Sequence, residues 1–154
     1  MTLSISIHER PELTLEYLVL DVNGTITNRG VLIEGVEERI DSLRKVLDVR
    51  LVSADTFGTL DTIAERLQAT PVRVGSGVDK LRALDMFGRD RCAVIGNGAN
   101  DALILEAAAI GFVVVGPEGA SAGSLRVADV VCASAVDALD LLLDTKALSA
   151  TLRG

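Results

Sequence analysis

The chain of 154 residues has the length of one ordinary domain. Hydrophobic residues make up 49% of it but aromatic residues only 3%, so aliphatic side chains must fill the core, as is typical of buried parallel strands covered by helices. The formal net charge of −7 argues against nucleic acid and anionic membranes as partners, because phosphate contacts need clustered lysine and arginine.

Three further features exclude other classes of protein. His8, the only histidine, lies in the polar first stretch of the chain, which argues against zinc hydrolases and Ser-His-Asp triads. Cys92 and Cys132 lie within apolar runs and are expected to be small buried hydrophobic residues rather than a disulfide or metal pair. Residues 1–11 lack the pattern of a signal peptide, and no apolar stretch reaches membrane-spanning length. The sequence therefore predicts a soluble, cytoplasmic protein.

Short aliphatic runs alternate with amphipathic segments along the chain. This alternation predicts one α/β domain over residues 1–154, with a doubly wound, mostly parallel sheet and a core over about residues 17–143. In chain order, the predicted elements are a strand at 17–22, a short strand or hairpin at 31–33, a helix at 36–47, a strand at 49–52, a helix at 59–67, a strand at 72–74, a helix at 80–84, a strand at 92–95, a helix at about 100–109, strands at 112–115 and 130–132, and a helix at 136–143.

Polar residues follow several of the predicted strands. In an open parallel sheet, sites form beyond the carboxyl ends of the strands, so these residues are expected to lie along one edge. Lys80 begins the helix that precedes the fourth core strand and is expected at the same edge. The residues at the three strand ends are Asp21, Asn23 and Gly24, then Ser53 and Ala54, and finally Asn97, Asn100 and Asp101.

The chemistry of these residues is that of phosphoryl transfer. Two carboxylates, Asp21 and Asp101, form a set of hard oxygen ligands that suits Mg²⁺ together with water and a substrate phosphate. A carboxylate can also attack phosphorus directly and form an aspartyl-phosphate. Ser53 can donate a hydrogen bond to phosphate oxygens, Lys80 can balance charge, and Gly24 lets backbone amides approach the ligand.

Each residue taken alone has a structural alternative. Asp21 followed by Asn and Gly is most often a turn, Ser53 and Asp55 are able to cap the next helix, and Lys80 is of a type usually found at the surface. Their joint order, each at the end of a predicted strand or helix, favours the chemical interpretation.

These motifs resemble those of the haloacid dehalogenase superfamily of phosphotransferases. Residues 21–25, Asp-Val-Asn-Gly-Thr, resemble the first motif, Asp-x-Asp-Gly-Thr; residues 52–53 resemble the second and Lys80 the third. Residues 96–101, Gly-Asn-Gly-Ala-Asn-Asp, resemble the fourth, Gly-Asp-Gly-x-Asn-Asp, and with residues 102–105 are similar to the hinge motif of P-type ATPase phosphorylation domains. The resemblance implies a parallel-sheet core, a Mg²⁺ cofactor and an aspartyl-phosphate intermediate on Asp21.

The resemblance also implies a role for each matching residue. The metal ligands would be Asp21, the backbone carbonyl of Asn23, and the side chains of the fourth motif. Lys80 would steady the nucleophile. The implied catalytic residues are Asp21, Asn23, Ser53 and Lys80. The implied substrate-binding residues are Gly24, Ser53, Ala54, Lys80 and Asn100, of which Asn100 acts through support of the fourth-motif loop. The implied metal ligands are Asp21, Asn23, Asn97 and Asp101.

Two departures from the family pattern weaken the expected catalysis. Asn23 replaces the second aspartate of the first motif, the general acid and base, and an amide cannot exchange that proton. Asn97 replaces the first aspartate of the fourth motif, so Mg²⁺ should bind more weakly. We therefore expect a slow phosphohydrolase or a domain with a persistent aspartyl-phosphate; the alternative is a regulatory module that binds phosphate or Mg²⁺ without turnover. Both asparagines precede glycine, a context prone to deamidation.

The sequence leaves no room for a cap domain. Only 31 residues separate Asp21 from Ser53, and 26 separate Ser53 from Lys80. We expect an open site that accepts a bulky phosphorylated substrate of unknown identity or borrows a lid from a neighbouring subunit in a homo-oligomer. Residues 28–35 are the candidate lid or oligomer contact, and an ordinary sheet edge is the equally weighted alternative.

Overall fold

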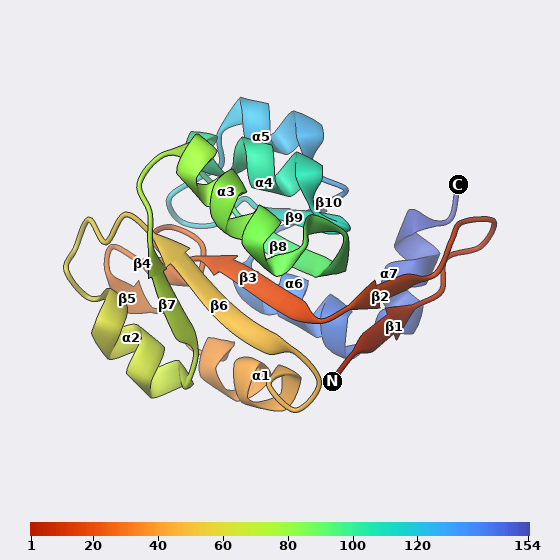
Figure 1. Cartoon of the computed structure of the whole chain (residues 1–154), viewed down its shortest axis with the longest axis horizontal. Coiled ribbons are helices and arrows are strands. Elements are labelled where there is room, and N and C mark those ends of the chain that lie inside the picture. The colour runs from red at the N-terminus through yellow and green to blue at the C-terminus, as the bar shows by residue number, and fades with distance from the viewer.

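A six-stranded parallel sheet forms the centre of the computed structural model, which describes residues 1–154 (Figure 1). Its strands are β3 (Tyr17–Asp21), β6 (Asp48–Ser53), β7 (Thr70–Arg73), β8 (Cys92–Gly96), β9 (Ile110–Val114) and β10 (Val130–Cys132). They lie in the order β10-β9-β8-β3-β6-β7, and every neighbouring pair is parallel. This order confirms the predicted doubly wound α/β fold, with β3 at the centre of the sheet.

Helices cover both faces of the sheet (Figure 1). They are α1 (Val36–Leu43), α2 (Leu60–Leu67), α3 (Gly77–Phe87), α4 (Ala102–Ala107), α5 (Ala122–Val127), α6 (Ala135–Leu143) and α7 (Thr145–Leu152), with short 3₁₀ turns at Arg89–Arg91 and Ala99–Asp101. Successive residues of β3 alternate between the faces: Leu18 and Leu20 pack in the large core cluster with α1 and α6, and Val19 packs in the smaller one with α3 and α4. Burial on both faces explains why this strand is an unbroken aliphatic run.

Several element boundaries differ from the prediction, among them the end of α1 and the start of β7. Helix α1 ends at Leu43, although apolar spacing extends to Leu47, which is still buried. The helix stops because Asp48 already begins β6, where its amide donates to the carbonyl of Glu16. Strand β7 begins earlier than predicted and includes Pro71; as an edge strand it tolerates the missing donor.

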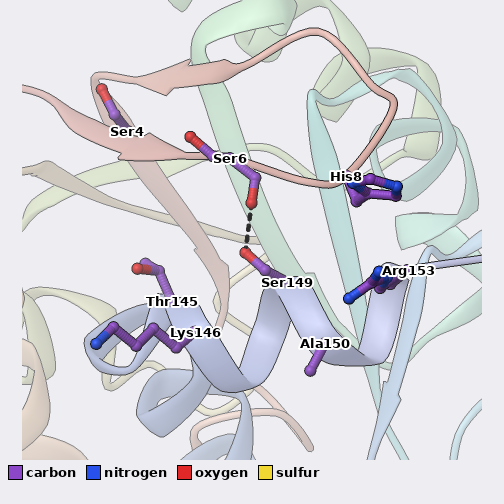
Figure 2. A pocket seen from close by; sticks show the side chains of 8 residues that line it. All are labelled: Ser4, Ser6, His8, Thr145, Lys146, Ser149, Ala150 and Arg153. Carbon is purple, nitrogen blue, oxygen red and sulfur yellow. Dashed lines mark hydrogen bonds between the residues drawn. The ribbon is translucent and has the colours of Figure 1, made fainter.

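The packed core extends beyond residues 17–143. Strands β1 (Leu3–Ile5) and β2 (Leu13–Leu15) form an antiparallel hairpin that precedes β3, and Ile5 and Leu148 of α7 are both fully buried in the large cluster. The Ser149 hydroxyl donates to the carbonyl of Ser6 at 2.7 Å, which fastens α7 to this hairpin (Figure 2). The alternation of serine with leucine and isoleucine over residues 3–7 is itself the pattern of a half-buried strand, which the sequence prediction did not use. None of the helices is long and apolar enough to cross a bilayer.

A second hairpin follows β3 at the carboxyl edge of the sheet. Strands β4 (Thr27–Asn28) and β5 (Val31–Leu32) pair antiparallel; of the two alternatives for residues 31–33, a short strand or a hairpin, the hairpin is the one formed. Its tip is formed by Arg29 and Gly30, both with positive φ, at 49° and 86°. This hairpin and α1 fill the stretch between Asp21 and β6.

Candidate active site

Three charged side chains meet below the carboxyl ends of β3 and β8. The Lys80 ammonium group lies 2.8 Å from Oδ1 of Asp21 and 2.8 Å from Oδ1 of Asp101. Their side chains are almost completely buried, with exposed fractions of 1% for Lys80, 8% for Asp21 and 0% for Asp101. Residues at the end of β3, in the first turn of α3 and after β8 are thus brought into one buried ion cluster, as the sequence predicts.

The cluster carries an excess negative charge, because two carboxylates face one ammonium group. Burial, followed by the charge of Asp101, raises the pKa of Asp21 to about 7, against the opposing effect of Lys80. Desolvation works to lower the pKa of Lys80, but its two carboxylate partners outweigh that effect and raise it. Lys80 therefore stays protonated, and Asp21 is the member of the cluster that gains or loses a proton near neutral pH.

Asp101 holds both Lys80 and the loop that follows β8. Its Oδ1 accepts from Lys80, and its Oδ2 accepts from the backbone amides of Asn97 and Gly98, at 3.1 and 3.0 Å. A Cβ at Gly96 would lie 2.8 Å from this carboxyl group, so only glycine fits there. With both oxygens engaged and no exposed surface, Asp101 positions its neighbours, and its role as a metal ligand stays a prediction.

Thr25 links the nucleophile to the loop after β8, and the sequence prediction assigned it no role. Its Oγ1 lies 2.8 Å from Oδ2 of Asp21 and 3.0 Å from Oδ1 of Asn97. A hydroxyl has one hydrogen and donates to only one of them at a time. The sequence feature that could have identified Thr25 is its place in the first motif, directly after Gly24.

The two asparagines that replace family aspartates differ in their surroundings. Asn97 is 8% exposed, and its Nδ2 donates to the carbonyl of Gly119 at 3.0 Å. The side chain of Asn23 is partly exposed and makes no hydrogen bond within the chain. Asn97 is therefore fixed in place, whereas Asn23 has free donors and acceptors.

The loop after β6 combines a buried hydroxyl with a helix cap. Ser53 is 2% exposed, and its Oγ accepts from the amide of Asp55 at 2.9 Å, which leaves its own hydrogen free to donate. Asp55, at a φ of 61°, accepts from the amide of Leu60 through Oδ1. The capping alternative is therefore right for Asp55, while Ala54 between the two is exposed.

Asn100 lies at the surface, where the loop after β8 meets the start of α3. Its Nδ2 is 3.4 Å from the carbonyl of Gly75, and a Cβ at Gly77 would lie 3.2 Å from its backbone oxygen. This close approach holds the loop against the helix turn that carries Lys80. The role of Asn100 in substrate binding, through support of this loop, stays a prediction.

The β4–β5 hairpin packs against other loops of its own chain beside the site. The amide of Arg29, at the tip of the β4–β5 hairpin, donates to Oε2 of Glu118 in the loop after β9, at 2.9 Å. On the other side, the Phe57 ring lies 3.4 Å from where a Cβ of Gly30 would be. The hairpin thus touches loops of its own chain, and Asp21 retains only 6% exposure. The sequence marked residues 116–121 only as a loop, so neither Glu118 nor Phe57 was expected at the site.

The oxygen atoms beside Asp21 suit Mg²⁺ in type. No group of three or more His, Cys, Asp or Glu side chains gathers in a way that could hold a metal ion. A magnesium site here would combine the Asp21 carboxylate, the Asn97 side-chain oxygen and the Asn23 carbonyl with water, as this ion commonly does. The donors fit the ion, with one carboxylate fewer than the family motif supplies.

A polar hollow of about 450 Å³ lies away from this site, between β1 and α7 (Figure 2). His8, Lys146 and Arg153 line it together with serine and threonine hydroxyls. Because β1 and β2 precede the amino end of β3, this hollow lies apart from the carboxyl edge that carries Asp21 (Figure 1). His8 is therefore no part of the active site.

Both cysteines are free and buried. Burial raises the pKa of the Cys92 thiol to about 12 and that of Cys132 to about 11, so neither is a thiolate nucleophile near neutral pH. This agrees with the prediction that they are small buried hydrophobic residues.

Comparison with known proteins places this geometry in context. No protein-family model matches the sequence. An uncharacterized protein of Methanocaldococcus jannaschii is 39% identical over 80 residues, which are 49% of this chain and 86% of that protein. The two proteins belong to one family.

Two solved structures share the fold. That of 3-deoxy-D-manno-octulosonate 8-phosphate phosphatase from Moraxella catarrhalis, in complex with magnesium, phosphate and KDO, has a TM-score of 0.71 and 16% identity over 90% of this chain and 94% of that one. The catalytic domain of the CPx-ATPase CopB-B has a TM-score of 0.58 and 19% identity over 77% of this chain and 46% of that one. These likenesses confirm the fold that the sequence resemblance implied.

Proposed function

We propose that the chain, whose fold and four motifs resemble those of the haloacid dehalogenase superfamily, is a Mg²⁺-dependent phosphohydrolase or phosphotransferase that forms an aspartyl-phosphate on Asp21. The observation that carries the proposal is the direct contact of Lys80 with the carboxylate of Asp21 at 2.8 Å. A buried carboxylate held by an ammonium group is the arrangement expected of a nucleophile that receives a phosphoryl group.

The reaction begins with attack of an Asp21 carboxylate oxygen on phosphorus. The new O–P bond forms as the bond to the leaving-group oxygen breaks, and that oxygen keeps the electron pair. Lys80 offsets the charge of the nucleophile and the transferred group, and the Ser53 hydroxyl donates to a phosphate oxygen. Hydrolysis of the aspartyl-phosphate by water then restores Asp21 and releases inorganic phosphate.

Mg²⁺ would be held by the carboxylate of Asp21, the carbonyl of Asn23 and the side-chain oxygen of Asn97. When bound, the ion neutralises charge on the phosphate. The phosphatase from Moraxella catarrhalis, whose structure contains magnesium and phosphate, has a similar fold. This similarity of fold supports the choice of magnesium as an analogy. Asn97 contributes no charge, so a weaker affinity is part of the proposal.

Slow turnover follows from Asn23. A positioned acid or base typically contributes about a hundredfold to ten-thousandfold to the rate, and an amide side chain supplies neither. The leaving group must take its proton from water, and the water that attacks the aspartyl-phosphate must lose its proton without help. The phosphorylated form should therefore persist.

The test is to incubate the protein with Mg²⁺ and acetyl phosphate, quench it in acid and measure its intact mass. We expect a phosphoryl adduct on the wild type and none on Asp21→Asn. Asp90→Asn is the matched control, because Asp90 is exposed and makes no side-chain hydrogen bond. An adduct that survives in Asp21→Asn, or a wild type without any, would contradict the proposal.

A second candidate function is a regulatory module that binds phosphate without turnover. The replacement of the acid and base by Asn23 favours it, because binding needs Lys80 and Ser53 but not proton transfer. Beryllofluoride, a mimic of the aspartyl-phosphate, separates the two candidates. Binding of this mimic without an adduct from acetyl phosphate would support the module.

A further inference from the structure

Two Asn-Gly pairs lie in the site, and each asparagine stands where the family motif has an aspartate. In such a pair, the backbone nitrogen of the glycine can attack the side-chain carbonyl carbon of the asparagine, because glycine lacks a Cβ that would hinder the approach. The pairs are Asn23–Gly24 and Asn97–Gly98. Their surroundings decide which of them is able to react.

The second pair is protected. The oxygen of the Asn97 side chain lies 3.0 Å from the Thr25 hydroxyl, and its nitrogen donates to Gly119 at 3.0 Å. The attacking atom is also engaged, because the Gly98 amide donates to Asp101 at 3.0 Å. Ring closure here would break several buried hydrogen bonds at once, each costly to leave unmade.

The first pair differs at its side chain. The Asn23 side chain is partly exposed and has no hydrogen-bond partner within the chain, while the backbone of Asn23 pairs with Thr27 in an isolated parallel bridge. Gly24 adopts a φ of 77° in the turn after β3, where a Cβ would lie 2.6 Å from Nδ2 of Asn97. The turn therefore requires glycine at this place, and the same glycine leaves the Asn23 side chain open to attack.

We propose that Asn23 is a self-modification site, at which loss of ammonia converts its amide into the carboxylate that proton transfer in this site requires. The bond from the Gly24 nitrogen to Cγ of Asn23 forms, the Cγ–Nδ2 bond breaks, and ammonia leaves with the proton of the glycine amide. Water then opens the succinimide ring. Opening at Cγ gives an aspartate at position 23, and opening at the backbone carbonyl gives isoaspartate, which lengthens the main chain.

The consequence rests on the proposed function. An aspartate at position 23 lies two residues after Asp21 and supplies the general acid and base that the encoded sequence lacks, a contribution of about a hundredfold to ten-thousandfold. Freshly made protein would hold its phosphoryl group, and aged protein would release it. The chain would thus gain hydrolytic activity with time rather than lose it.

The experiment ages the purified full chain at mildly alkaline pH and maps its peptides by mass spectrometry at intervals. We expect the amide-to-acid mass change in the peptide with Asn23, while the peptide with Asn97 stays unchanged and serves as internal control. In parallel, the release of phosphate from acetyl phosphate should rise in proportion to the aspartate fraction, toward the rate of the Asn23→Asp variant. Asn23→Gln, whose ring closure is slower, should show neither change over the same interval.

Three results would overturn the proposal: reaction at Asn97 before Asn23, an unchanged Asn23 in fully aged protein, or isoaspartate as the sole product. A failure of the proposed function looks different. In that case Asn23→Asp would be as inert as Asp21→Asn, while the mass change at position 23 would still be seen; the modification would then stand without its catalytic consequence.

Discussion

The ammonium group of Lys80 lies 2.8 Å from a carboxylate oxygen of Asp21, although 59 positions separate the two residues along the chain. The same group also lies 2.8 Å from Asp101. One buried cation thus joins the end of β3, the start of α3 and the loop after β8. Most of the behaviour expected of this site follows from that shared charge.

Removal of Lys80 should destabilise the fold. Lys80→Met leaves two buried carboxylates without a cation, and loss of one partner of a buried ion pair costs about 3 to 5 kcal/mol. The free energy of unfolding from urea titration at neutral pH measures this loss. Lys146→Met, at an exposed lysine, is the control and should change it by less than about 0.5 kcal/mol. A loss below about 1 kcal/mol in Lys80→Met would show that the cluster contributes little.

The stability of the wild type relative to Asp21→Asn should depend on pH. Burial raises the pKa of Asp21 from 3.8 to about 7, so the folded protein keeps a proton that the unfolded chain has already lost. The stabilisation from this proton is fully present below the unfolded pKa and is lost as the pH rises through about 7. Urea titrations without Mg²⁺ should therefore show the wild type losing free energy of unfolding relative to Asp21→Asn between about pH 4 and pH 7. A difference that stays flat over this window, or that grows with pH, would contradict the raised pKa.

Asn97→Asp should strengthen magnesium binding. The added carboxylate stands beside the Asp21 oxygens, and a ligand set with one more charge should bind Mg²⁺ roughly tenfold or more tightly. Calorimetric titration with Mg²⁺ in the presence of beryllofluoride measures the affinity. Without the ion, the same variant should be less stable, because Thr25 would then lie between two carboxylates with one hydrogen to donate. Gln68→Glu adds the same charge at an exposed residue after α2, away from the site; it is the matched control and should leave the affinity nearly unchanged.

Glu118 should hold the tip of the β4–β5 hairpin in place. Its carboxylate accepts the amide of Arg29 at 2.9 Å, so Glu118→Ala removes the acceptor and should speed hydrogen exchange in the peptide that contains Arg29. Glu118→Gln keeps an oxygen at the same place and should preserve most of the protection. Equal exchange in all three proteins would mean that the hairpin is held by other contacts, such as that of Phe57 with Gly30.

The sequence by itself determined the layered fold and most of the members of the site. Aliphatic runs alternating with amphipathic segments fix a parallel sheet, because only strands buried on both faces are apolar throughout. Residues at the carboxyl ends of such strands must share an edge, so Asp21, Ser53 and Asp101 could be grouped before any coordinates were known. The elements it missed were the β1–β2 hairpin, whose first strand alternates serine with apolar residues, and the helices α5 and α7.

The tertiary structure alone decided which polar atoms pair and which stay free. Hydrogen bonds and ion pairs depend on positions good to a few tenths of an ångström, and no residue pattern carries that information. It showed that Asp101 pairs with Lys80, brought Thr25 to Asp21, and placed Glu118 and Phe57 against the β4–β5 hairpin. It also separated two asparagines that look alike in the sequence: the Asn97 side chain is held by its neighbours, and the Asn23 side chain makes no hydrogen bond within the chain.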